Sequence, residues 1–171
     1  MQRKYKFTWD LIGNLEIGRP NLGNTTRVEV YRLMQFAFRD VLEVQYGTEE
    51  ADAVFYVAGK LAGTEFYEEF LSGITDFKVF ISELQRLMEE MMVGILRIEE
   101  VDLEAQNLIL TVAEALDCSG LPELDYEVCT YDEGLIAGIL ECFTGKPYEV
   151  KEVDCWCTGD RTCRFRARRV A

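Results

Sequence analysis

The sequence predicts an α+β fold that combines N-terminal helices with a mainly four-stranded antiparallel sheet. Apolar residues recur at three-and-four spacing between residues 28 and 91, which is typical of helices that bury one face. Beyond Gly94 this period changes, and two pairs of strands follow, each joined by a short turn. Short turns connect antiparallel strands. With 171 residues, 49% of them apolar, the chain can form one core, so we expect a single domain over residues 1–171.

Three helices are expected in the first half of the chain. Residues 24–26 offer Asn and Thr side chains as caps for the first helix. Thr48 is a candidate cap for the second helix, which runs to residues 72–73, and the third helix follows Asp76. The preceding segment, 10–24, contains three glycines and one proline, so it is expected to be a loop or a weakly ordered strand.

The second half of the chain combines strands with one further helix. An acidic turn at 102–104 joins the first strand pair, and a glycine-containing turn at 158–160 joins the second. The expected elements are strands Ile95–Val101 and Asn107–Ala113, helix Tyr126–Phe143, and strands Tyr148–Cys155 and Cys163–Val170. The helices are then expected to cover at least one face of the sheet.

Charge and composition exclude several classes of function. With 31 acidic and 18 basic side chains, the net charge of −13 repels phosphate backbones and anionic membrane surfaces, so we expect no nucleic-acid partner. Histidine is absent, which excludes a histidine base and histidine-ligated haem. No apolar stretch reaches the roughly 20 residues of a membrane span. The basic start lacks the apolar run of a signal peptide, so a cytoplasmic protein with reduced thiols is expected.

The six cysteines are the candidate metal ligands. Cys155, Cys157 and Cys163 lie across a glycine-containing turn, which brings sulfur atoms together as in many structural zinc sites. The alternative is that these cysteines are buried and pack as small apolar residues. Residues 161–171 contain five arginines and no acidic residue, so they can offset the charge of a thiolate site. They can also protect a solvated edge strand from unwanted pairing.

A set of glycines, cysteines and their neighbours resembles the 4-vinyl-reductase-like domain. The N-terminal part of this pattern is Leu22-Gly23, Tyr31-Arg32-Leu33, Gly47, Ala58-Gly59-Lys60, Gly63 and Cys118-Ser119-Gly120-Leu121-Pro122. Its C-terminal signature is Cys129, Gly134, Gly138, Gly145, Glu152, Cys155, Gly159-Asp160, Cys163 and Phe165. The resemblance extends from about residue 15 to residue 170, and small archaeal hydrocarbon-binding proteins consist of this domain alone.

The resemblance implies a fold, a partner and a cofactor. The fold is akin to haem-nitric-oxide-binding domains and to trafficking-complex (TRAPP) subunits that hold an acyl chain, and the partner is a second copy of the chain. In the aromatic-sensing bacterial regulators of this family, a phenol-like molecule binds beside a zinc ion held by three cysteines and one glutamate. Carried over by position, the implied zinc ligands are Cys129, Glu152, Cys155 and Cys163.

One geometric requirement accompanies this ligand set. Glu152 and Cys155 are three residues apart, so on an ideal strand they face opposite sides. A bulge or the turn itself must therefore re-aim one of them. Cys157 lies on the same face as Cys155 and is the competing fourth ligand. Cys118 and Cys142 are expected to be packing residues.

Apolar stripes supply candidate walls for a ligand cavity. The candidate ligand-binding residues are Phe77, Phe80, Leu84, Leu108, Leu110, Ile139 and Val150. Apolar stripes at this spacing usually form ordinary hydrophobic core, so the spacing alone does not predict a cavity. The cavity is what the resemblance to the family implies.

The function expected from these observations is non-enzymatic. A zinc-stabilised dimer would bind or sense a small hydrophobic molecule, either hydrocarbon-like or aromatic, in an apolar cavity. Two alternatives remain open. One is a part in reducing the vinyl group of a tetrapyrrole, although the sequence contains no dinucleotide-binding fingerprint. The other is a scaffold or assembly subunit without a ligand.

Overall fold

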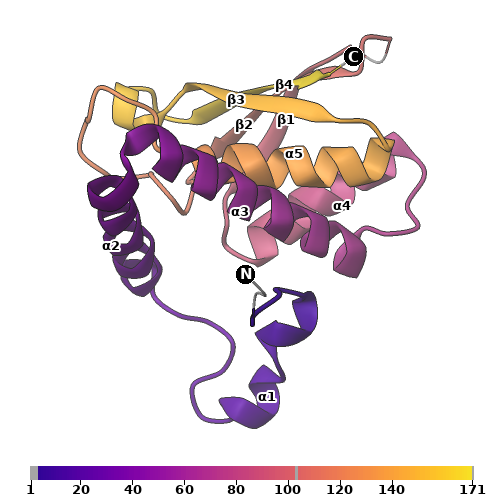
Figure 1. The fold of residues 1–171 in the computed structure, drawn as a ribbon. Helices are drawn as coiled ribbons and strands as arrows, with labels where there is room; N and C mark the ends of the chain where they lie inside the picture. Colours follow the sequence, from indigo (N-terminus) through magenta and orange to yellow (C-terminus); the bar gives the residue numbers. More distant parts are fainter. Residues whose placement is uncertain (1–3, 103, 171) are drawn as a thin grey trace.

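The chain folds into a four-stranded antiparallel sheet with helices packed against one face (Figure 1). The computed structural model describes residues 4–102 and 104–170. The first residues of the basic start, Leu103 in the expected acidic turn, and Ala171 lie outside the described residues. The helices are η1 (Trp9–Ile12), α1 (Leu15–Gly18), α2 (Val28–Tyr46), α3 (Thr48–Phe70), α4 (Phe77–Glu90), α5 (Thr130–Thr144) and η2 (Trp156–Thr158). The strands are β1 (Ile95–Asp102), β2 (Asn107–Ala113), β3 (Tyr148–Asp154) and β4 (Cys163–Arg169).

The α+β fold and its main elements confirm the prediction from the sequence, with local corrections. Asp76 caps α4 as expected, since its carboxylate accepts a hydrogen bond of 3.0 Å from the backbone N–H of Val79. Thr48 is the first residue of α3 rather than its cap, because Gly47 occupies that position. Segment 10–24 contains the short helices η1 and α1 instead of a strand. No helix in residues 4–102 and 104–170 is long and apolar enough to cross a membrane.

The last α-helix begins later than the sequence indicated. α5 starts at Thr130, whereas the apolar pattern suggested a start at Tyr126. Cys129 is the N-cap residue, with a backbone φ of −91° and ψ of 36°, so the segment before it is not helical. This shift places a thiol at the end of the helix instead of inside it.

The strands occur in the order β1-β2-β4-β3, so pairing between β2 and β4 joins the two hairpins. β4 is therefore an interior strand, and the alternative of an arginine-protected edge strand is wrong. Along β4, Cys163 and Phe165 are buried on the helix-covered side, while Arg166 and Arg168 are exposed. Arg164 pairs with acidic side chains of β1 and β3. The arginines thus lie on the opposite face from the thiols and do not directly offset their charge.

The core lies between the sheet and helices α4 and α5. Phe80 of α4 stacks on Phe143 of α5 with a ring-centroid distance of 4.0 Å, and Phe77 lies 6.1 Å from the same ring. From the sheet side, Phe165 is fully buried. Aromatic pairs of this kind add to the free energy gained from burial alone.

Helices α3 and α5 cross at backbone contact distance, and glycines make this possible. A Cβ atom added to Gly59 would lie 2.0 Å from the carbonyl oxygen of Tyr131, and one added to Gly134 would lie 2.0 Å from that of Tyr56. The other glycines of this crossing are Gly63 and Gly138. All four belong to the sequence pattern that resembles the 4-vinyl-reductase-like domain, and the close approach gives that pattern a physical reason.

We predict that Gly59→Ala lowers the free energy of unfolding by about 1–3 kcal/mol or more, because the added methyl group forces the helix backbones apart. Chemical denaturation monitored by circular dichroism measures this change. Gly18→Ala in α1 is the matched control, since a Cβ there meets no atom within 4 Å. Equal losses of stability in the two variants would contradict the role assigned to the crossing.

Candidate functional site

Four buried cysteines form a compact cluster of sulfur atoms. The Sγ atoms of Cys118, Cys129, Cys155 and Cys163 all lie within 4.8 Å of one another. The Sγ of Cys163 is 3.0 Å from that of Cys118 and 3.8 Å from that of Cys129. None of the four residues is more than 1% exposed. A cluster with this spacing and burial can hold a metal ion.

Each thiol comes from a different segment of the chain. Cys118 lies in the loop after β2, Cys129 caps α5, Cys155 precedes η2, and Cys163 opens β4. The η2 turn is fixed locally, because the hydroxyl group of Thr158 accepts the backbone N–H of Cys155 at 3.1 Å. The cluster therefore joins the helix, the loop and the C-terminal hairpin at one point.

Glu152 lies beside this cluster but is not among the four residues whose ligand atoms gather within 4.8 Å. A bulge between Glu152 and Asp154 turns the chain, as the sequence geometry required, and Glu152 is 2% exposed. Its Oε2 accepts the backbone N–H of Cys129 at 3.2 Å, while its Oε1 has no hydrogen-bond partner among the described residues. Burial raises the pKa of Glu152 to about 8.

The remaining cysteines lie outside the cluster. Cys157, the competing ligand, is buried, and burial raises the pKa of its thiol to about 12. Cys142 on α5 is half-buried. Of the four residues implied by the resemblance, Cys129, Cys155 and Cys163 lie in the cluster. Cys118, which was expected to be a packing residue, lies there as well. Cys118 is part of the segment 118–122, which belongs to the sequence pattern that resembles the 4-vinyl-reductase-like domain, and this could have indicated a role beyond packing.

The thiols of the cluster shift the pKa values of one another in opposite directions. Hydrogen bonds from neighbouring thiols, that of Cys118 first, lower the pKa of Cys155 strongly. Contacts within the cluster, again with Cys118 first, raise the pKa of Cys129 and of Cys163. A thiolate is the form of cysteine that binds a divalent cation, so hydrogen bonds that lower the pKa of Cys155 favour metal binding.

A second feature is an apolar cavity of about 260 Å³, called here the inner cavity. It lies among α3, α4, α5 and the N-terminal segment, and Tyr31 of α2 reaches it. Its lining residues are Phe7, Trp9, Ile12, Tyr31, Ala62, Phe66, Met88, Met91, Val93, Leu116, Asp117, Tyr131, Asp132, Leu135 and Ile139. The N-terminal segment is held over it, because the Trp9 backbone N–H donates to Glu65 Oε2 at 2.8 Å and the Trp9 ring lies edge-on to Phe70.

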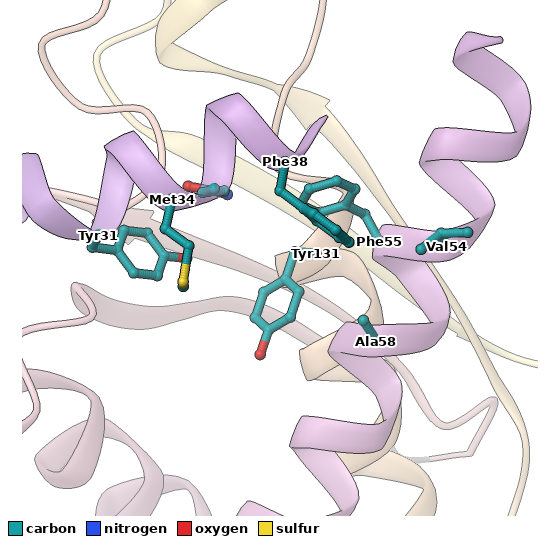
Figure 2. A pocket seen from close by; sticks show the side chains of 8 residues that line it. Tyr31, Met34, Phe38, Val54, Phe55, Ala58 and Tyr131 are labelled. Atoms are coloured by element: carbon teal, nitrogen blue, oxygen red, sulfur yellow. The ribbon is translucent and has the colours of Figure 1, made fainter. Parts of the chain in front are cut away.

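An open apolar groove of about 410 Å³, called the outer groove, adjoins the inner cavity. It lies between α2 and α3, and Figure 2 shows Phe38, Phe55 and Val54 along it. Tyr31 and Tyr131 line both spaces, so the groove and the cavity adjoin at these two residues. In Figure 2 the hydroxyl group of Tyr131 is directed away from Phe38 and Phe55.

The inner cavity ends at a polar cluster next to the thiols. The Tyr31 hydroxyl group donates to Asp117 Oδ1 at 2.7 Å, and Gln35 Nε2 donates to Asp117 Oδ2 at 2.8 Å. Asp117 is 2% exposed, and burial raises its pKa despite these two hydrogen bonds. Burial, followed by the charge of Asp117, raises the pKa of Asp132. Asp117 directly precedes Cys118, and Asp132 lies one helical turn after Cys129.

The candidate ligand residues from the sequence occupy a different part of the interior. Four of them line a void of about 20 Å³ among the sheet, α4 and α5, namely Leu84, Leu108, Leu110 and Ile139. A space of this size holds about one water molecule. Phe77, Phe80 and Val150 pack in the core and line neither the inner cavity nor the outer groove. Among the seven, only Ile139 also lines the inner cavity.

Comparison with known sequences finds a family model that matches part of the chain. The model of the 4-vinyl-reductase-like domain matches residues 108–169, which comprise most of β2 together with α5, β3, β4 and all four clustered cysteines. Two uncharacterised proteins of Methanocaldococcus jannaschii are each 28% identical to this chain. The first alignment covers 91% of this chain and 83% of that protein, and the second covers 87% and 81%. Residues 108–169 thus match the family that the sequence resemblance indicated.

Solved structures share the fold. A vinyl-4-reductase family protein from Methanocaldococcus jannaschii superposes over 100% of this chain and 99% of its own, with a TM-score of 0.62 and 16% identity. The phenol-responsive sensory domain of the transcription activator PoxR, solved with phenol, superposes with a TM-score of 0.63 and 19% identity. The superposition covers 84% of this chain and 75% of that domain. A trafficking protein particle complex subunit 3 from Naegleria fowleri, covalently bound to palmitic acid, superposes with a TM-score of 0.65 and 17% identity. The superposition covers 84% of this chain and 95% of that subunit. An H-NOX protein from S. oneidensis superposes with a TM-score of 0.51 and 13% identity, over 78% of this chain and 72% of that protein.

We predict that the purified protein contains a bound metal ion and that Cys118→Ser and Cys163→Ser each lose it, because each removes a thiolate donor. Metal content measured by mass spectrometry of the acid-digested protein tests this. Both variants should also melt at a lower temperature, since metal binding contributes to folding. Cys142→Ser, outside the cluster, is the matched control. If Glu152→Gln loses the metal while Cys118→Ser retains it, the fourth ligand is the carboxylate and not the thiol of Cys118.

Proposed function

We propose that the chain acts as one non-enzymatic domain that binds a small hydrophobic molecule in the inner cavity, in a zinc-stabilised homodimer in the cytoplasm. The observation that carries this proposal is an apolar space of about 260 Å³ whose lining includes Asp117, the residue before the clustered Cys118, and Asp132, one helical turn after the clustered Cys129. A cavity larger than about 150 Å³ accommodates a benzene ring when its walls are apolar. Burial of apolar surface, at about 25 cal/mol per Å², supplies the affinity.

Zinc is the metal that fits the donor set best. Four thiolates in a compact, buried cluster are a typical structural zinc site, with no position left open for a substrate. Cys129, Cys155 and Cys163 belong both to the family ligand set and to the cluster, and Cys118 completes the four. Glu152 then supports the site from beside it, by accepting the backbone N–H of Cys129. Bound zinc supplies cross-linking between the loop, α5 and the hairpin.

The position of the inner cavity links binding of a small molecule there to the geometry of the metal site. Asp117 and Asp132 line the cavity, and each is on the same short segment as a clustered cysteine. A molecule that displaces these segments moves Cys118 and Cys129 with them. The neighbours of known structure that carry a phenol or a palmitic acid support a binding role for this fold. Because the thiols leave no open metal position, this geometry favours binding over reduction of a vinyl group.

The homodimer is supported by an apolar helix face that the chain itself leaves uncovered. In α2 the exposed fractions of Leu33, Met34 and Val44 are 71%, 70% and 80%, and Gln35 is the helix's buried residue. Figure 1 shows α2 standing apart from the layers formed by the sheet and the other long helices. Val57 on the neighbouring α3 is also exposed, at 65%. An apolar surface of this extent on two adjacent helices is typical of an interface.

We predict that Ala62→Phe abolishes binding of small molecules without loss of zinc, because the ring fills the inner cavity on the α3 side. Native mass spectrometry of protein purified without chelator, followed by analysis of released organic molecules, measures both properties. Ala53→Phe, at an exposed position of the same helix, is the control. Retention of the same organic adduct by Ala62→Phe would contradict binding in this cavity.

We predict that the protein is a dimer and that the double variant Leu33→Glu, Val44→Glu is a monomer, because two carboxylates cannot be buried unpaired in an apolar interface. Size-exclusion chromatography with light scattering gives the mass. Val79→Glu, which places the same charge on an exposed apolar position of α4, should remain dimeric. A monomeric unmodified protein, or a dimeric double variant, would refute this interface.

A further inference from the structure

The walls of the inner cavity are apolar, but its polar end has carboxylate oxygen atoms without a charged donor. Asp117 is satisfied, since two side chains donate to it. Asp132 lines the cavity from the first turn of α5 and receives no hydrogen bond or ion pair from the described residues. Gln35, on the side of the outer groove, is 9% exposed, and its Oε1 also has no partner among them. The other side-chain donors on the cavity wall, the Tyr131 hydroxyl group and the Trp9 indole N–H, are neutral.

This imbalance restricts the chemistry of the ligand. A pure hydrocarbon would bury the carboxyl group of Asp132 without a partner, which costs free energy. A carboxylate ligand would bring a like charge against Asp117 and Asp132. A ligand with a charged donor instead forms a charge-assisted hydrogen bond with Asp132 inside the cavity.

The described residues do not supply that charge. Arg32, the basic residue near Asp117, donates to the backbone carbonyl groups of Leu116 and Ser119 at 2.8 and 2.9 Å. It does not pair with Asp132 in the described structure. A cationic group that complements Asp132 would therefore come from a bound molecule.

We propose that the ligand is an apolar amine, with a body of about one aromatic ring in the inner cavity and a protonated amino group that donates hydrogen bonds to Asp132. This inference rests on the proposed binding function and narrows its ligand class. It distinguishes the inner cavity from a pocket for hydrocarbons, phenols or fatty acids.

The test uses four probes that share a benzyl group and differ only in the terminal group, which are benzylamine, benzyl alcohol, ethylbenzene and phenylacetate. Isothermal titration calorimetry on the zinc-containing protein measures their affinities. Benzylamine should bind about tenfold or more tighter than ethylbenzene, because a hydrogen bond to a charged group contributes about 1.5–3 kcal/mol. Benzyl alcohol should lie between these two, and phenylacetate should bind most weakly.

The variant Asp132→Asn tests the residue. It should remove the preference for benzylamine while leaving the affinity for ethylbenzene unchanged, and Asp40→Asn, at an exposed position of α2, should change neither. Equal or tighter binding of ethylbenzene, benzyl alcohol or phenylacetate to the unmodified protein overturns the amine assignment but leaves the binding function standing. If no probe binds, both the inference and the proposed function fail. The probe series alone decides the question if Asp132→Asn does not fold.

Discussion

The contact between α3 and α5 is the constraint on which the rest of the structure depends. The glycines Gly59 and Gly134 let the two helix backbones touch, at a distance that leaves no room for a Cβ atom. α5 is thereby fixed both against α3 and against the sheet, since its other side packs on β3. The same contact sets the position of the α5 N-terminus, where Cys129 and Asp132 reside. Any widening of this crossing would move both candidate sites together.

The thiol cluster and the inner cavity are two parts of one local structure. The loop after β2 supplies Asp117 to the cavity and Cys118 to the cluster, and the first turn of α5 supplies Asp132 and its cap Cys129. Side chains one helical turn apart lie on the same face of a helix. A displacement of Asp132 in the cavity therefore also displaces Cys129 in the cluster. A rigid metal cross-link here would stabilise the wall of a cavity that is otherwise closed by short elements such as η1.

The sequence located part of the candidate site and missed part of it for a definable reason. Cys155 and Cys163 are near one another in the hairpin, so their proximity follows from local geometry. The bulge near Glu152 was also predictable, because two residues three apart cannot share a strand face without one. Cys118 joins Cys163 across 45 residues of chain, and only the pairing of β2 with β4 brings that loop to the hairpin. Asp132 carried no periodic signal, because its side chain reaches a cavity formed by several separate elements.

By itself the sequence determined the α+β class, most helix and strand boundaries, and the chemical character of a histidine-free, cysteine-rich protein. These are local properties, set by hydrophobic period, caps and turns within a few residues. Tertiary structure decided that β4 is an interior strand, that its arginines face away from the thiols, and that the inner cavity lies by α3 and α5 rather than between α4 and the sheet. The physical reason is that strand order and cavity position depend on how remote apolar surfaces pack against one another, and packing at that range is not encoded in any single segment.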